Sequence, residues 1–310
     1  MIRYILQRLL ATVAILLAVI FVIYGIVLFS PGDPATTMLG IQATPEAVAE
    51  LNAELGYDRP FLVQYVDYVK NLIVDQDMGT SFKYGTPVWG EISLRFPRTL
   101  LLVSCAVLIQ SVLALTVGLL CVRHRGKFLD HAVSAVVGFT TAVPSYASAL
   151  VLIVVFSVWL ELTPVYGVRS WTGYILPVVT LVLASMGYPI KTVRNAMLDT
   201  LQQDYVRTAR AIGEPERRVV YTHALRNALV PIVTTLGYQF ASMLGGTVVT
   251  ESIFSINGVG ALMVDAVQSK DIPLMMGVTV CITASFCLVQ LLMELSYLAL
   301  DPRIRAKYGI

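Results

Sequence analysis

Long apolar runs constrain the fold of this chain more than any other feature. Each run is long enough to cross the roughly 30 Å hydrocarbon core of a bilayer as an α-helix. Of the 310 residues 56% are hydrophobic and only 14% are charged, so a single soluble core cannot hide the apolar surface. We predict an all-α integral membrane protein with six transmembrane helices, at residues 9–29, 99–122, 132–160, 171–189, 231–250 and 273–300.

The basic residues predict how these helices are oriented. Fifteen of the 22 Lys and Arg residues fall on one side of the membrane, which holds both chain ends and the connections after the second and fourth spans. The positive-inside rule places that side, including residues 191–230, in the cytoplasm. The first span follows Arg3 and Arg8 and lacks a small-x-small cleavage site, so we expect an uncleaved span instead of a signal peptide.

A polar, basic stretch at residues 204–231 interrupts the apolar pattern. Asp204 is expected to cap a short helix at residues 205–212, because its carboxylate can accept from exposed backbone N–H groups. Gly213 is expected to end that helix in the left-handed conformation, and Pro215 to begin a second helix that runs to about residue 230.

The side chains of the first short helix suit docking better than catalysis. Thr208, Ala209 and Ala211 are small, so this helix can lie close in a groove of a partner. Arg207 and Arg210 are expected to reach acidic groups beside that groove. The alternative interpretation is a generic basic loop that is kept inside by membrane topology.

The stretch resembles the cytoplasmic coupling loop, or EAA motif, of binding-protein-dependent ABC importer permeases, and most closely their dipeptide, oligopeptide and nickel branch. Residues 205–211, then Gly213, then residues 223–229 are typical of that branch. Arg207-Thr208-Ala209 replaces the Glu-Ala-Ala of the wider superfamily. The resemblance implies these ATPase-coupling residues: Asp204, Tyr205, Arg207, Thr208, Ala209, Arg210, Ala211, Gly213, His223, Arg226 and Asn227.

The likeness extends over residues 1–305 and predicts the domain organisation. We expect an N-terminal span at residues 1–29 and a helical extracytoplasmic cap at residues 30–98. A permease core follows at residues 99–300, with a cytoplasmic tail at 301–310. The turn at residues 30–34 and the ending at 301–305 are further points of likeness.

Two polar residues after the fifth span are candidates for the substrate pathway. Related permeases have a string similar to residues 251–260 at the outer mouth, usually with proline where this chain has Asn257. Glu251 has the charge to contact a cationic group such as a peptide N-terminus. A helix cap or a contact with the partner subunit is the alternative role for Glu251, and the one we favour.

Nothing in the sequence supports catalysis by this chain. It has no GxxxxGK[ST] string, no HExxH pair and no supported Ser/His/Asp arrangement, so we predict a subunit without enzyme activity, metal or bound cofactor. Glu294 is the only formal charge expected inside the spans. The resemblance implies a type I importer permease fold in a prokaryotic plasma membrane. The implied partners are a second permease, two ATPases that carry ATP and Mg²⁺, and an extracytoplasmic substrate-binding protein.

The substrate is the least constrained of these expectations. The branch imports di- and oligopeptides or nickel; we favour short peptides and keep nickel or a metal chelate as the alternative, because Cys105, Cys281 and Cys287 lack convincing ligand spacing. An ion-coupled carrier or channel is the alternative from another class. Nucleic-acid binding is disfavoured by the small net charge of +2 and the lack of a basic stripe with interleaved aromatics.

Overall fold

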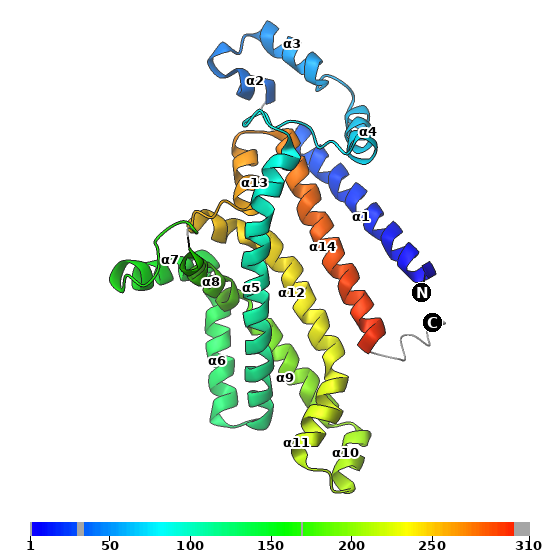
Figure 1. Cartoon of the computed structure of the whole chain (residues 1–310), viewed down its shortest axis with the longest axis vertical. Helices are drawn as coiled ribbons and strands as arrows, with labels where there is room; N and C mark the ends of the chain where they lie inside the picture. The colour runs from blue at the N-terminus through cyan, green and yellow to red at the C-terminus, as the bar shows by residue number, and fades with distance from the viewer. Residues whose placement is uncertain (1, 30–33, 169, 301–310) are drawn as a thin grey trace. The chain divides into compact units, whose positions relative to one another are not determined.

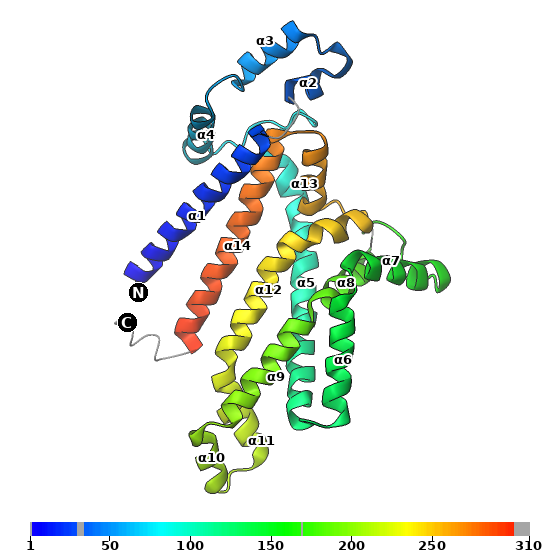
Figure 2. The ribbon, with the colours of Figure 1, turned by 180° about the vertical axis from the view of Figure 1, so that it is seen from behind.

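The computed structural model describes residues 2–29, 34–168 and 170–300, and these are almost entirely helical (Figures 1 and 2). The predictions for residues 30–33 and 301–310 lie outside the described residues. The longer helices are α1 (Ile2–Phe29), α3 (Pro45–Leu55), α4 (Phe61–Lys70), α5 (Val88–Arg123), α6 (Phe128–Ala142), α7 (Ser145–Leu152), α8 (Ile175–Ser185), α9 (Gly187–Leu201), α12 (Leu225–Ile253), α13 (Val259–Gln268) and α14 (Ile272–Leu300).

The remaining elements are short. They are α2 (Pro34–Leu39), α10 (Asp204–Ala211), α11 (Glu216–Arg218), two 3-10 helices, η1 (Gly40–Gln42) and η4 (Trp171–Tyr174), and three π-helices, η2 (Asn71–Asp75), η3 (Ile153–Trp159) and η5 (Val219–Ala224). The chain divides into two compact units. Unit 1 comprises Met1–Thr99 and Asn257–Cys287, and unit 2 comprises Leu100–Ile256 and Leu288–Ile310.

The apolar helices agree with the predicted number of spans. In the described residues, four continuous helices are long and apolar enough to cross a membrane, and two further pairs raise the number to six if each bent pair is one span. The first pair bends by 98° between α6 and the helix that α7 and η3 form together, and the second by 51° between α8 and α9. Pro144 explains the sharper bend, because the residue before a proline avoids helical geometry and Val143 is extended.

Several helix boundaries differ from the predicted spans, most of all at α5, α9 and α12, and α9 ends at Leu201 instead of residue 189. Helix α5 begins at Val88, eleven residues before the predicted start at 99, and it contains Pro97. Helix α12 begins at Leu225 and continues through Pro231, which we had expected to begin a span after a separate second helix. Both prolines lie inside their helices, where each removes one backbone hydrogen bond that the rest of the helix must tolerate. Both helices therefore extend beyond the apolar stretch that the sequence marks.

Unit 2 is built on close contact between α9 and its neighbours. Ile190, Val193 and Met197 of α9 are buried in a cluster with Ala228 and Ile232 of α12. At Gly118 of α5, a Cβ atom would approach the Val193 side chain to 2.7 Å, so this crossing requires a glycine. Helix α6 also contacts α9, because Arg194 of α9 donates to both carboxylate oxygens of Asp130 at the start of α6, at 2.7 and 2.8 Å.

Candidate functional site: a docking hairpin

The predicted coupling stretch forms a helical hairpin at residues 204–224, which we call the docking hairpin. It consists of α10, α11 and η5, and lies at the same end of unit 2 as the connection between α5 and α6 (Figures 1 and 2). Its second arm has no loop after it, because η5 leads into α12 at Leu225 with helical backbone angles. The second arm is thus the N-terminal end of a long helix, and α10 folds back against it.

A small apolar core holds the two arms together. Val206 and Ala209 of α10 are buried against Val219 of η5, with Leu201 at the edge. Residues 206 and 209 are three apart, so they share one face of α10. The small side chain of Ala209 therefore lets the two arms of the hairpin approach each other, and its predicted part in coupling stays a prediction.

The charged residues of the hairpin pair with each other. Arg210 donates to Glu216 at 2.6 Å, and the Nε2 atom of His223 lies 2.7 Å from a Glu214 carboxylate oxygen. The hydrogen bond from Arg210 to Glu216, reinforced by the attraction between their charges, raises the pKa of the Arg210 guanidinium. We expected Arg210 to reach acidic groups of a partner. In this chain it crosses from one arm of the hairpin to the other.

Gly213 makes the turn between the arms, as predicted. Its φ is +86°, and the Glu214 N–H donates to the carbonyl of Ala209 at 3.2 Å, which closes the end of α10. The predicted cap at the other end is wrong. Gln203 is the N-cap and makes no side-chain cap bond, while Asp204 is the first helical residue with a side chain 97% exposed. Asp204 instead lies 3.6 Å from Arg207.

The face of α10 away from the hairpin core is exposed. It carries Tyr205, Arg207, Thr208 and Ala211, and Ile212 follows it with 72% of its side chain exposed. Arg207 is far from the hairpin core, with a side chain 72% exposed. This face combines small, aromatic and basic side chains, a composition that fits contact with a groove of mixed polarity.

The remaining predicted coupling residues lie at the base of the hairpin. Arg226 and Asn227 are exposed on the first turn of α12, and the Asn227 amide donates to the carbonyl of His223 at 2.8 Å. Of the predicted coupling residues, His223, Arg226 and Asn227 thus lie next to each other where η5 joins α12. Val206, Val219 and Glu214 were not singled out from the sequence; the spacing of residues 206 and 209 was the available signal.

A large cavity of about 1190 Å³ adjoins the hairpin inside unit 2. Its lining includes the Arg210–Glu216 pair and the apolar side chains of Leu115, Leu119 and Leu198. The sequence placed Arg123 and Arg125 on the cytoplasmic side but did not predict that they line this cavity. Three or more His, Cys, Asp or Glu side chains do not gather as a possible metal site anywhere in the described part of the chain.

The two predicted pathway residues have different surroundings. Glu251 of α12 is completely buried, and its carbonyl accepts from the Ile256 N–H at 2.8 Å. Asn257 is exposed in the turn before α13, and its carbonyl accepts from Arg98 at 3.1 Å. The burial of Glu251 favours the structural role that we preferred for it.

Sequence comparisons relate the whole chain to membrane components of transport systems. Residues 112–306 match the family described as binding-protein-dependent transport system inner membrane component, and residues 1–103 match its N-terminal region. The chain is 36% identical to the glutathione transport system permease protein GsiC of Pectobacterium atrosepticum, over 99% of this chain and 100% of the relative. It is 34% identical to the probable peptide ABC transporter permease protein y4tP of Sinorhizobium fredii, over 97% and 99%.

Solved structures have the same fold. An inward-facing structure of the MetNI methionine ABC transporter matches with a TM-score of 0.56 and 20% identity, covering 66% of this chain and 93% of that chain. An amino acid ABC transporter solved with histidines matches with a TM-score of 0.54 and 16% identity, covering 66% and 92%.

Proposed function

Since this chain belongs to the family of binding-protein-dependent transport system inner membrane components, we propose that it forms half of the translocation pathway of an ATP-driven importer for short peptides. As an ABC importer permease of the peptide family, it is a non-catalytic, multi-pass membrane subunit with no cofactor of its own. The other half of the pathway is a second, homologous permease. Two ATPase subunits bind ATP and Mg²⁺ and hydrolyse the ATP, and an extracytoplasmic protein delivers the substrate.

The observation that carries this proposal is the docking hairpin. Its outward face presents Tyr205, Arg207 and Ala211, while Val206 and Ala209 fix it to η5. A partner ATPase binds this face, and its movement on ATP binding is passed to η5. Because η5 continues without a break into α12, a displacement of the hairpin moves a membrane-spanning helix directly.

Helix α12 transmits the displacement to the rest of unit 2. Ala228 and Ile232 pack on α9, whose Arg194 is bound to Asp130 at the start of α6. These contacts are tight and direct, so the helices are expected to move together and not to slide independently. The permease thus supplies two states, inward-open and outward-open, and ATP at the distant site shifts the balance between them.

The orientation follows from the basic residues. The docking hairpin and the α5–α6 connection together carry Arg123, Arg125, Lys127, Arg207, Arg210, Arg217 and Arg218, and the positive-inside rule places them in the cytoplasm with both chain termini. The relatives named for glutathione and peptide transport support a peptide substrate. Import of nickel or a metal chelate is the alternative within the branch.

Purification of the intact complex from its native membrane tests the proposal. Mass spectrometry of the ligand on the binding protein is expected to find short peptides, and proteoliposomes with the whole complex are expected to import that peptide only with ATP. Proteoliposomes with this chain alone are the control. Uptake by this chain alone, driven by an ion gradient, contradicts the importer mechanism, whereas a metal chelate on the binding protein contradicts only the peptide assignment.

A further inference from the structure

The segment formed by α4 and η2, residues 61–75, packs along one side of α1. The ring of Phe61 lies 5.0 Å from the ring of Phe21, and the ring of Tyr65 lies 5.2 Å from the same residue. The Tyr65 hydroxyl donates to the backbone carbonyl of Leu17 at 3.1 Å. The segment therefore contacts α1 well before the end of that helix at Phe29.

The position of Leu17 sets the depth of this contact. Leu17 precedes Phe29 by twelve residues, which corresponds to about 18 Å along a helix axis. The apolar run of α1, Leu6–Phe29, is about 36 Å long at 1.5 Å per residue, so its end at Phe29 extends at most about 6 Å beyond the roughly 30 Å hydrocarbon core that this span crosses. A tilt of α1 by as much as 40° still leaves Leu17 about 14 Å below that end. The side chains of α4 thus reach into the membrane, and the segment cannot lie wholly in water above it.

The side of the segment that turns away from α1 is apolar and exposed. Leu62, Val66 and Ile73 have exposed fractions of 62%, 58% and 62%, and their spacing of four and seven residues places them along one stripe. Val63 and Val74 widen the stripe. Exposed apolar residues of α1, among them Val22 and Ile26, provide the same kind of surface on the helix beside it.

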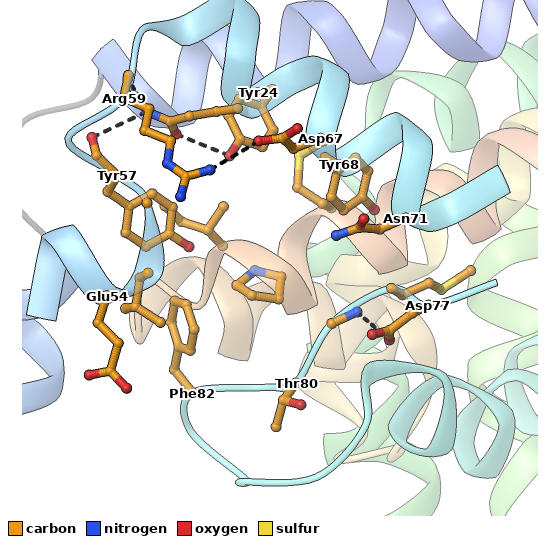
Figure 3. A pocket seen from close by; sticks show the side chains of 18 residues that line it. Tyr24, Glu54, Tyr57, Arg59, Asp67, Tyr68, Asn71, Asp77, Thr80 and Phe82 are labelled. Carbon is orange, nitrogen blue, oxygen red and sulfur yellow. Dashed lines mark hydrogen bonds and ion pairs between the residues drawn. The ribbon is translucent and has the colours of Figure 1, made fainter. Parts of the chain in front are cut away.

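The third side of the segment is polar and faces a cavity. Asp67 and Asn71 line a cavity of about 460 Å³ within unit 1 (Figure 3), where Asp67 lies 3.4 Å from Arg59. Gln64 accepts from the Tyr24 hydroxyl at 3.1 Å and donates to the carbonyl of Arg59 at 2.7 Å. One short segment thus has an aromatic face on a span, a polar face on a cavity and an apolar face with nothing from the described chain on it.

We propose that residues 61–75 form an interfacial segment of the outer leaflet, with Leu62, Val66 and Ile73 against lipid acyl chains. An amphipathic helix in the plane of the interface buries its apolar side by about 5–10 Å. The deeper contact at Leu17 is made by the tip of the Tyr65 side chain, so the backbone of α4 lies closer to the membrane surface than Leu17 does. Lys70 is exposed within this stripe, between Val66 and Val74, and its long side chain lets the ammonium reach the headgroups. The segment holds α1 and the cavity at a fixed level of the membrane.

The assignment of the segment to the outer leaflet rests on the proposed function, through the predicted orientation of the chain. Its depth in the membrane rests only on α1 being a span. The extracytoplasmic cap that we expected at residues 30–98 is therefore not wholly in water, because residues 61–75 lie at the membrane interface. α3 remains in water, and its Glu50 is exposed.

Spin-label accessibility in the intact complex, reconstituted in nanodiscs, tests the placement. The four native cysteines are replaced by alanine, and a nitroxide is attached at Val66→Cys or Ile73→Cys, with Val22→Cys as the reference in the span and Glu50→Cys as the matched control in water. Collision with O₂ is expected to exceed collision with a water-soluble nickel chelate at positions 66 and 73 by several-fold, as at position 22. The ratio is expected to be reversed at position 50.

Two results overturn the proposal. A preference for the nickel chelate at positions 66 and 73 places the segment in water, and low collision with both reagents places it under another protein chain. Val66→Trp gives a second measurement, since brominated acyl chains are expected to quench its fluorescence as strongly as that of Val22→Trp. Neither readout needs transport, so failure of the importer proposal is separable from failure of this one.

Discussion

Two polar clusters of this chain are built in opposite ways. In unit 1, Asp271 is fully buried at the start of α14 and accepts from the Ser81 hydroxyl at 2.5 Å and from the Lys83 N–H at 3.0 Å. Its other carboxylate oxygen accepts from the Leu274 N–H at 3.1 Å, which caps the helix. In unit 2, the docking hairpin has exposed ion pairs over a core of three small apolar side chains.

The difference separates a structural cluster from a proposed docking surface. The buried Asp271 carboxylate accepts hydrogen bonds from both the loop at residues 81–83 and α14, and so fixes one to the other. Its loss leaves the groups that donate to it without an acceptor. Exposed pairs such as Arg210–Glu216 contribute at most about 1 kcal/mol each, so the hairpin depends on Val206, Ala209 and Val219. Its charged residues can therefore exchange partners without unfolding it.

The largest expected effect is in the buried cluster. Asp271→Ala should destabilise unit 1 by about 3 kcal/mol, because the cap is lost and two further donors lose a buried acceptor. Thermal unfolding of the purified complex, with proteolysis of the loop at 81–83 as a local probe, measures this. Asp75→Ala, at an exposed position, is the control and should shift unfolding by less than about 0.5 kcal/mol. Equal unfolding temperatures for Asp271→Ala and Asp75→Ala would contradict the structural role of the buried Asp271 cluster.

A matched pair in α10 separates packing from docking. Ala209→Leu should cost about 1–3 kcal/mol of local stability by overfilling the hairpin core. Ala211→Leu enlarges an exposed residue on the same helix, so the hairpin should remain folded while ATP-driven uptake falls. Hydrogen exchange of α10 and uptake in proteoliposomes give the two readouts. Normal uptake by Ala211→Leu would mean that this face is not bound by a partner.

The turn of the hairpin gives a smaller effect on stability and a clear one on transport. Gly213→Val should abolish ATP-coupled uptake at a local cost of about 1–2 kcal/mol, because a β-branched residue resists φ of +86°. Gly213→Asn is the control, since asparagine tolerates this conformation, and it should retain uptake. A Cβ at this position meets no neighbouring atom, so crowding would not explain a loss. Membrane insertion should be normal in both variants.

The smallest effect is the pH dependence of the exposed part of unit 1. Tyr84 and Lys83 donate to Asp265 at 2.7 and 3.0 Å, and these hydrogen bonds lower the pKa of Asp265 and raise that of Lys83. The Asp265 contribution is therefore present above its unfolded pKa and lost as the pH falls through the lower folded value. Wild type and Asp265→Asn should differ in unfolding temperature at neutral pH and converge below about pH 4. A constant difference down to the acid limit would contradict this.

The sequence predicted features that depend on local chemistry. Gly213 ends α10 because glycine adopts positive φ, and the break at Pro144 follows from the restriction on the residue before it. Contacts between distant residues were not predictable. Ser81 and Asp271 are separated by 190 residues, and no pattern in either segment indicates the other. The burial of Ala209 was predictable only in part. Its spacing from Val206 in the sequence places both residues on one face of α10, but nothing in the sequence indicates that Val219 packs against that face.

Cross-linking in the intact complex tests the central claim most directly. A photoreactive cross-linker is attached at Ala211→Cys on the exposed face of α10, with Arg218→Cys, on the other arm of the hairpin, for comparison. We predict that the label at position 211 captures an ATP-binding subunit, and that the yield changes when ATP is added. Failure to capture that subunit from position 211, in a complex that imports peptide normally, would contradict the docking role of the hairpin.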